Sequence, residues 1–195
     1  MPRAGLDAEL VAAGAAALAD EVGLANVTMG LLAERLGVRA PSLYKHVSGQ
    51  ADVTRRVAVL ALTELGDALR DALAGRAGKD ALTAAARTLR EYVVAHQGRY
   101  SATVRVDPDG GPDDPLVAAG ARVLDALSAV LVGYEIEPAD TVHALRTLRS
   151  LLHGFAVLEA AGGFQMPTDL DDSFTWLVDF ADRGLRAHGG GAGAP

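Results

Sequence analysis

The chain of 195 residues contains no cysteine. This absence excludes disulfide bonds, thiolate zinc sites, iron–sulfur clusters and a thiol nucleophile, and it fits the reducing cytoplasm in which we expect the protein to work. Aromatic residues are also scarce, at 5% of the chain, although half of all residues are hydrophobic. This composition, with its abundant alanine, favours the packing of small residues between helices over a β-sandwich.

Long apolar runs and catalytic motifs are missing as well. No stretch of about 18 residues is uninterruptedly apolar, and acidic residues break the alanine-rich N-terminal stretch, so we expect neither a membrane span nor a signal peptide. The sequence has no HExxH motif, no Gly-rich phosphate loop and no recognisable catalytic triad, and its histidines are widely spaced. We therefore expect no enzyme active site, no metal site and no cofactor.

The net charge of −7 is unevenly distributed. Residues 1–56 carry six basic and six acidic groups, whereas the rest of the chain carries twelve basic and nineteen acidic groups. Because phosphate binding depends on local charge, the acidic excess does not exclude DNA as a partner of the N-terminal segment. A neutral segment attracts DNA only weakly, so binding there would depend on a few well-placed contacts and on dimerisation.

The apolar spacing, together with glycine and proline positions, predicts an all-α fold of about nine helices. A first helix over residues 6–22 is followed by two short helices over 29–36 and 41–47. Longer helices are predicted over 50–73, 80–97 (ended by Gly98), 116–132, 138–161 and 170–187. We expect three parts: a helix-turn-helix domain at 1–49, a larger helical domain at 50–188 and a disordered Gly-rich tail at 189–195.

The most specific signal lies between Thr28 and Val47, where a short helix, a glycine-containing turn and a second short helix follow one another. Thr28 can cap the first of these helices through its hydroxyl. Ala33 is small where the two helices must approach, and apolar residues at positions 32, 36, 38 and 43 supply their shared contact. This is the layout of a helix-turn-helix, whose second helix enters the major groove of DNA.

Residues 5–56 resemble the DNA-binding domain of the tetracycline-repressor (TetR) family. The sequence Leu36-Gly37-Val38-x-x-Pro41-Ser42-Leu43-Tyr44-x-His46-Val47 matches that family's signature, with Thr28 at the matching spacing. A pattern of twenty residues with an ordered cap, turn and proline is far more specific than a short motif. The resemblance implies a DNA-binding domain followed by a helical domain that binds a ligand and forms a homodimer.

The resemblance also implies roles in DNA binding. Thr28 would hold a phosphate through its hydroxyl and nearby backbone N–H groups. Arg39 and Ala40 lie at the entry to the recognition helix, where Arg39 could pair with guanine. Pro41 and Leu43 could contact a thymine methyl group, although Leu43 would also suit the core. The remaining candidates would reach phosphates or base edges: Ser42, Tyr44, Lys45 and His46.

Two regions depart from the family pattern. Met29 and Gly30 stand where many members carry a long polar or basic side chain, and Gly49 and Gln50 stand where many carry a phosphate-binding lysine. Each departure removes a DNA contact. An alternative hypothesis is therefore a helical ligand-binding or interaction protein with weak or lost DNA binding, in which Tyr44 is a packing residue.

The segment 145–161 is apolar over most of its circumference, which is typical of a helix buried on more than one side. Together with the last helix it could form a four-helix dimer interface, or both helices could be covered within one subunit. The interface candidates are Leu148, Leu151, Leu152, Phe155, Leu158, Leu177 and Phe180. Leu152-His153-Gly154 also resembles a C-terminal subtype of the family with a Trp-His-Gly tripeptide, here with leucine in place of tryptophan.

Candidates for a ligand pocket are polar groups on otherwise apolar helices, and each of them would also suit a structural role. They are Tyr92, His96, Tyr100, His143 and His153, with Arg99 or Arg105 placed to meet an anion. The apolar surroundings predict a small, mostly hydrophobic effector. We expect a homodimeric repressor that binds a palindromic operator in double-stranded DNA and is released by this effector, although an activator would share the same sequence.

Overall fold

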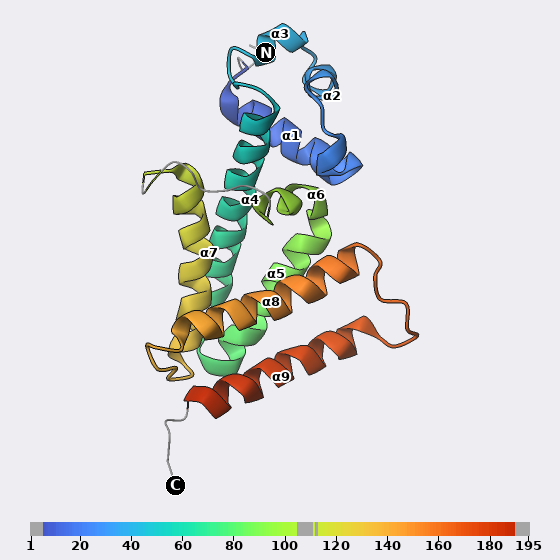
Figure 1. Cartoon of the computed structure of the whole chain (residues 1–195). Helices are drawn as coiled ribbons and strands as arrows, with labels where there is room; N and C mark the ends of the chain where they lie inside the picture. Colours follow the sequence, from blue (N-terminus) through green and yellow to red (C-terminus); the bar gives the residue numbers. More distant parts are fainter. Residues whose placement is uncertain (1–5, 105–110, 112, 190–195) are drawn as a thin grey trace. The chain divides into compact units, whose positions relative to one another are not determined.

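The computed structural model describes residues 6–104, 111 and 113–189. Within these residues the chain forms nine α-helices and two short 3₁₀ helices, with no strand (Figure 1), which confirms the predicted all-α class. The chain is divided into two compact units. The first comprises residues within 1–64 and 95–120, and the second comprises residues within 65–94 and 121–195.

The first unit begins with α1 (Ala8–Val22). Asp7 caps this helix, because its carboxylate accepts a hydrogen bond from the backbone N–H of Leu10 at 2.7 Å. The other elements of the unit follow in chain order: η1 (Leu24–Asn26), α2 (Met29–Arg35), α3 (Ala40–Leu43), the first part of α4 (Gln50–Leu73), α6 (Gln97–Tyr100), η2 (Ser101–Val104) and the start of α7 (Pro115–Val132).

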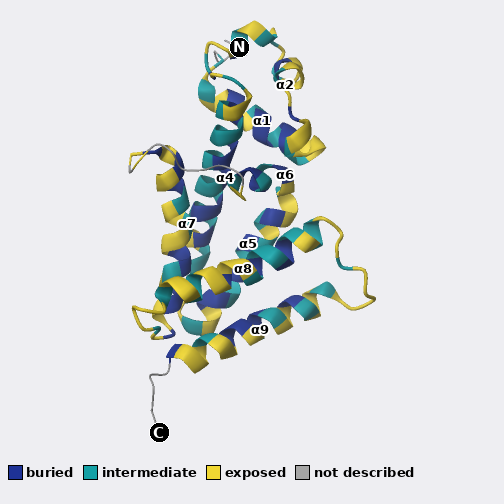
Figure 2. Ribbon diagram, in the orientation of Figure 1, coloured by how far each residue is buried: buried dark blue, intermediate teal, exposed yellow. Residues whose placement is uncertain are grey.

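Small and aliphatic side chains build the core of the first unit. Val11, Leu32, Leu43 and Val57 are fully buried there, and α1 adds a set of buried alanines. Figure 2 shows buried positions, in dark blue, along α1 and α4. Because alanine side chains are short, neighbouring elements can approach the backbone of α1 closely, and this proximity matters for the site described below.

The second unit contains the rest of α4, α5 (Gly78–Ala95), most of α7, α8 (Thr141–Ala160) and α9 (Leu170–Gly189). Arg90 on α5 connects three of these helices. Its guanidinium donates to both carboxylate oxygens of Glu159 at 2.6 Å and to Asp171 at 2.6 Å. The same group lies over the ring of Phe174, 4.6 Å from its centroid. One half-buried cation therefore holds α5, α8 and α9 together.

A second polar contact fixes the C-terminal half of α9. The buried hydroxyl of Tyr134 donates a hydrogen bond to Asp182 at 2.7 Å, and Arg186 donates to the same carboxylate at 3.1 Å. Burial of the phenol, and then its hydrogen bond to Asp182, raise the pKa of Tyr134 well above its usual range. The tyrosine therefore remains a neutral hydrogen-bond donor at physiological pH.

The structure corrects three expectations about helix boundaries. The third helix ends at Leu43, and residues 44–46 form a turn instead of continuing the helix to Val47. Gly98 does not end a helix but lies buried inside α6, which was not predicted, because a glycine can mark either a helix end or a close approach of backbones. Gly189 is the buried last residue of α9 and not part of a tail, and residues 190–195 lie outside the described residues.

One helix, α7, is long and apolar enough to span a membrane by length and composition alone, with a mean hydropathy of 1.7 over 18 residues. Arg122 and Asp125 interrupt it, so it is not a continuous apolar run. About a third of the helix is buried inside the protein. Core helices of water-soluble proteins meet the same criterion, so this observation by itself is weak evidence for a membrane segment.

Candidate DNA-binding site

The first helix of the predicted motif is held at both ends. At its start the hydroxyl of Thr28 accepts a hydrogen bond from the backbone N–H of Leu31 at 3.2 Å, as expected for a capping residue. After its end the chain reverses at Gly37, whose φ of +65° lies in the left-handed region that favours glycine. The turn between α2 and α3 therefore depends on this glycine.

The second helix, α3, is short and amphipathic. Leu43 has no exposed surface and Val47 is only 3% exposed, so these two residues anchor the segment in the core. The structure thus assigns Leu43 to the core and not to a base contact. The other predicted contacts in this segment are exposed or half-buried at its surface: Arg39, Ala40, Pro41, Ser42, Tyr44, Lys45 and His46.

The charge of this surface comes from few groups. Arg35 on α2 is bound to Glu21 of α1 at 2.6 Å, and this hydrogen bond lowers the pKa of Glu21, so both groups of the pair stay charged at neutral pH. Within the described part of the chain, neither Arg39 nor Lys45 takes part in an ion pair. These two cations are therefore the ones best placed to attract a phosphate backbone.

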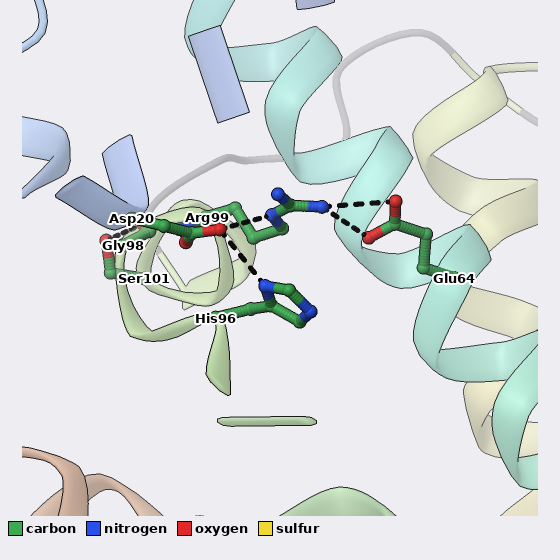
Figure 3. Close-up of polar contacts among 6 residues, drawn as sticks. All are labelled: Asp20, Glu64, His96, Gly98, Arg99 and Ser101. Carbon is green, nitrogen blue, oxygen red and sulfur yellow. Dashed lines mark hydrogen bonds and ion pairs between the residues drawn. The ribbon is translucent and has the colours of Figure 1, made fainter. Parts of the chain in front are cut away.

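A cluster of charged side chains lies at the other end of α1 (Figure 3). One oxygen of Asp20 accepts the backbone N–H of Arg99 at 2.8 Å. The other oxygen accepts the Nε–H of Arg99 at 2.7 Å and lies 3.1 Å from Nδ1 of His96. The guanidinium of Arg99 also donates to both oxygens of Glu64 on α4, at 2.9 and 3.1 Å. Arg99 therefore links α1, α4 and α6 within the first unit.

The charge state of this cluster follows from its surroundings. Burial alone would lower the pKa of Arg99, but the hydrogen bond to Glu64 and the charge of Asp20 outweigh it and raise the pKa. The side chain of Arg99 is only 14% exposed and that of Asp20 only 15%. The guanidinium is therefore permanently charged and largely shielded from solvent, and it faces carboxylates rather than a bound anion.

The predicted ligand-pocket residues fall into both units. His96 contacts Asp20, and Tyr100 is a buried residue at the end of α6. Tyr92 and His153 belong to the second unit, where burial and then the charge of Arg149 lower the pKa of His153. Arg105 lies outside the described residues. A ligand contact for these residues stays a prediction.

Of the predicted pocket residues, His143 lines one of three cavities in the described part of the chain, and the remaining lining comes from other residues. A groove of about 430 Å³ runs between α8 and α9; it is mostly apolar and has His143 and His188 in its lining. A cavity of about 400 Å³ lies between α4 and α7 in the second unit. Another of about 510 Å³ lies in the first unit, between α1, α4 and the start of α7.

The seven predicted interface residues are divided between core and surface. Leu148, Leu152 and Phe155 are buried in the single chain, so the core of the second unit accounts for them. Leu151 and Leu177 are partly buried, whereas Leu158 and Phe180 are each 50% exposed. That all seven form a dimer interface stays a prediction.

One further exposed residue of α9, Trp176, was not among the candidates predicted from the sequence. Trp176 is 64% exposed and stacks on Phe180, with ring centroids 5.5 Å apart and planes 13° apart. The signal was present, because this is the only tryptophan of the chain and it precedes Phe180 by four residues on one helix face. Two large exposed aromatic rings on α9 mark this face as a candidate for protein contact.

A capped helix, a glycine turn and a short helix with exposed basic and polar residues define the class of helix-turn-helix transcriptional regulators. The chain belongs to the TetR family of bacterial transcriptional regulators. The family of bacterial regulatory proteins described as the tetR family matches residues 11–56, and the tetracyclin repressor-like C-terminal domain matches residues 82–181. The protein is accordingly a DNA-binding transcriptional regulator and not an enzyme.

Two relatives support this assignment along most of the chain. The HTH-type transcriptional regulator YobS of Bacillus subtilis is 32% identical over 180 residues, which are 91% of each chain. The HTH-type transcriptional regulator Rv0681 of Mycobacterium tuberculosis is 35% identical over 190 residues, which are 96% of this chain and 86% of the relative.

Solved structures show the same fold. A protein of unknown function from Rhodococcus sp. RHA1 superposes with a TM-score of 0.78 at 21% identity, covering 95% of this chain and 99% of that one. BioQ of Mycobacterium smegmatis, solved with its double-stranded DNA operator, superposes with a TM-score of 0.70 at 23% identity, covering 94% and 100%. At these identities the likeness concerns the fold alone.

Proposed function

We propose that this protein is a homodimeric repressor that binds a palindromic operator and is released from it by a small, mostly hydrophobic ligand. Residues 1–49 read the DNA, residues 50–188 bind the ligand and dimerise, and the protein acts in the cytoplasm. The C-terminal part belongs to the Trp-His-Gly subtype, on the evidence of Leu152-His153-Gly154.

The observation that carries the DNA-binding proposal is that residues 39–47 bury some side chains in the core and expose others at the surface. Leu43 and Val47 are fixed in the core, and this fixation holds Tyr44, 57% exposed, and its neighbour Lys45 at the surface. A lysine and a tyrosine hydroxyl suit phosphate oxygens, and Arg39 at the helix entry suits the paired acceptors of guanine. The proposed contacts are Thr28, Arg39, Ala40, Pro41, Ser42, Tyr44, Lys45 and His46.

The dimer proposal is supported by the surface of α8 and α9. Exposed Leu158, Trp176 and Phe180 share these helices with the apolar groove. A two-fold dimer uses the same patch on both subunits, so a surface that carries both protruding rings and a groove can be complementary to itself. The palindromic operator follows from this symmetry, because each subunit would read one half-site.

The experiment is a titration of DNA at two salt concentrations. The DNA is a duplex selected from random sequences by the wild-type protein, which removes the need to know the operator. The double variant Tyr44→Ala/Lys45→Ala should bind at least about 100-fold more weakly, with a smaller dependence on salt, because it loses contacts worth roughly 1–3 kcal/mol each.

The matched control is Lys79→Ala, which removes the same charge from α5, where Lys79 pairs with Asp179 at 2.8 Å. This variant should bind like the wild type. Selection of no duplex would favour the alternative of a helical ligand-binding or interaction protein with weak or lost DNA binding, whereas equal binding by the double variant would reject Tyr44 and Lys45 as DNA contacts.

A further inference from the structure

The charged cluster around Asp20 lies where the chain passes between its two units. Glu64 is the last residue of α4 in the first unit, and Ala95 is the first residue after the chain returns from the second unit. His96, with φ −133° and ψ 42°, separates α5 from α6, and Arg99 follows one turn later. The chain leaves the first unit along α4 after Glu64 and returns to it at Ala95, at the end of α5. Arg99 therefore joins the point of exit to the point of return through its hydrogen bonds to Glu64.

The α6 helix is also in direct backbone contact with α1. A side-chain Cβ at Gly98 would overlap the carbonyl oxygen of Ala19 and the backbone nitrogen of Asp20. The hydrogen bond from the backbone N–H of Arg99 to Asp20, at 2.8 Å, adds a directional contact at the same place. With no space between the two backbones, α6 and the C-terminal end of α1 have to move together.

A second close contact of α1 lies at Gly14, nearer its N-terminal end, where α1 packs against α2. A Cβ there would come within 2.8 Å of the Leu36 side chain and 3.6 Å of Leu32, so α2 of the helix-turn-helix is seated directly on α1. A helix is a stiff element, and a shift imposed at Asp20 is therefore passed along α1 to the seat of α2.

We propose that Arg99 is a positioning residue for DNA recognition: by bridging Asp20 and Glu64 it holds α1, and the helix-turn-helix seated on it, in the register that operator binding requires. The inference rests on the proposed function. A partly buried ion pair gives little net stability, because desolvation of the charges offsets their attraction, whereas its directional hydrogen bonds fix geometry well. Breaking the bridge thus weakens operator binding without altering any residue at the DNA.

Whether Asp20→Asn strengthens or weakens DNA binding distinguishes the proposed bridge from a simple effect of net charge. Asp20→Asn makes the protein less negative, so charge alone predicts tighter DNA binding. The bridge predicts the opposite, because the amide cannot hold the guanidinium as the carboxylate does. We expect Asp20→Asn and Arg99→Gln to bind the selected duplex about tenfold more weakly than the wild type, a typical size for coupling between sites.

A second measurement is the discrimination between two spacings of the half-sites. This discrimination would not change if Arg99 only stabilised the fold. The same duplex is prepared with one base pair inserted at its centre of symmetry, which changes the separation of the half-sites. The wild type should discriminate strongly against the insertion, because its two recognition helices are held at one spacing. The Asp20→Asn and Arg99→Gln variants should lose most of this discrimination.

The control is Arg122→Gln, which removes the same charge as Arg99→Gln and also breaks a bridge between two helices, since Arg122 binds Asp67 on α4 at 3.1 Å. Arg122 lies in the second unit, and this variant should keep both the affinity and the discrimination of the wild type. Circular dichroism melting checks that each variant is folded.

Equal or tighter binding by folded Asp20→Asn, with unchanged discrimination, would overturn the proposal. Should Asp20→Asn fail to fold, Glu64→Gln decides, because this side chain is 37% exposed and its loss leaves the pair of Asp20 and Arg99 intact. Glu64→Gln should show the same loss of discrimination in weaker form, and unchanged behaviour would reject the bridge. Failure of the proposed function itself would be recognised separately, because the wild type would then select no duplex.

Discussion

The two units of this protein differ in how their elements are joined. In the first unit, backbones meet directly across glycine and alanine, as at Gly98 against Ala19. In the second unit such backbone contacts lie at or next to helix ends, as at Gly133 against Gly78 and Gly189 against Tyr134, and elsewhere a long side chain reaches between helices, as Arg90 does to Glu159 and Asp171. Close backbone contact leaves little freedom to adjust, whereas a side-chain network can rearrange with its helices. The difference fits a first unit that must present DNA contacts in fixed geometry and a second unit that responds to a ligand.

The surfaces of the two units differ as well. The first unit exposes Tyr44 beside the cations Lys45 and Arg39, a combination suited to a polyanion. The second unit exposes large apolar groups on α8 and α9, among them Leu158, Trp176 and Phe180. Such groups are suited to another apolar surface. Four experiments test this contrast, beginning with the largest expected effect.

The contrast in packing predicts that the glycine inside α6, where two backbones meet, is indispensable, whereas a glycine on an open face of α8 is replaceable. Gly98→Ala should lower the free energy of unfolding by about 3 kcal/mol or more, because the added methyl group overlaps the backbone of α1 and neither backbone can yield. Gly154→Ala on α8 meets nothing within 4 Å and should stabilise the protein by up to about 1 kcal/mol. Urea unfolding of both variants measures the difference, and a mild effect at Gly98 would remove the basis of the contrast.

The contrast in surfaces predicts that aromatic residues of α9 hold the dimer together. Trp176→Glu or Phe180→Glu should each weaken dimerisation by about 2 kcal/mol, roughly thirtyfold in the dissociation constant. Sedimentation equilibrium measures this change. In the wild type, emission of the only tryptophan should shift to shorter wavelength as the protein is concentrated, because dimerisation would cover it. Val132→Glu, at a position 78% exposed on α7, is the control and should leave the dimer unchanged.

The caps of α1 and α2 separate stability from DNA binding within the first unit. Thr28→Ala and Asp7→Ala should each cost about 1 kcal/mol of stability, because each removes a side-chain acceptor for a backbone N–H at a helix start. Thr28→Ala should also weaken binding of the selected duplex, whereas Asp7→Ala should not. Thermal melting and the DNA titration are compared for both variants, and equal DNA affinity would restrict Thr28 to its capping role.

The smallest expected effect concerns pH and the second unit. Burial and the charge of Arg149 lower the pKa of His153 below 6.5, so the unfolded chain takes up a proton at a pH at which the folded protein does not. As the pH falls through the ordinary histidine pKa of 6.5, the unfolded chain therefore binds more protons than the folded protein, and the free energy of unfolding decreases. His153→Gln should show a shallower decrease in melting temperature between about pH 7.5 and 5.5. Arg149→Gln should lie between this variant and the wild type, and identical slopes for all three would exclude His153 as a contributor.

Local patterns of the sequence were enough to predict the helix-turn-helix. Thr28 as a cap, Gly37 as the turn and Pro41 in the first turn of α3 each act through their own backbone or nearest neighbours, so their roles could be predicted without knowing the fold. The alternation of core and surface in residues 39–47 was predicted in the same way, except for Leu43, which fitted both environments until its full burial assigned it to the core.

Contacts distant in sequence could not be predicted in this way. His96 and Arg99 were assigned to a ligand pocket because polar groups on apolar helices can serve either purpose, and only the fold shows that they contact Asp20, 76 and 79 residues away. Leu148, Leu152 and Phe155 were indistinguishable from Leu158 by hydropathy, because an apolar helix has more than one face and the choice of the covered face depends on its neighbours.

The sequence by itself determined the class of fold, the position of the DNA-reading segment and the class of regulator, because caps, turns and apolar periodicity act over one or two helical turns. The tertiary structure alone decided that Gly98 is a point of backbone contact, that Arg99 bridges α1 and α4, and which side chains of α8 and α9 remain exposed. These features depend on which helices become neighbours, and that choice is made by packing of the whole unit and is not contained in any single segment.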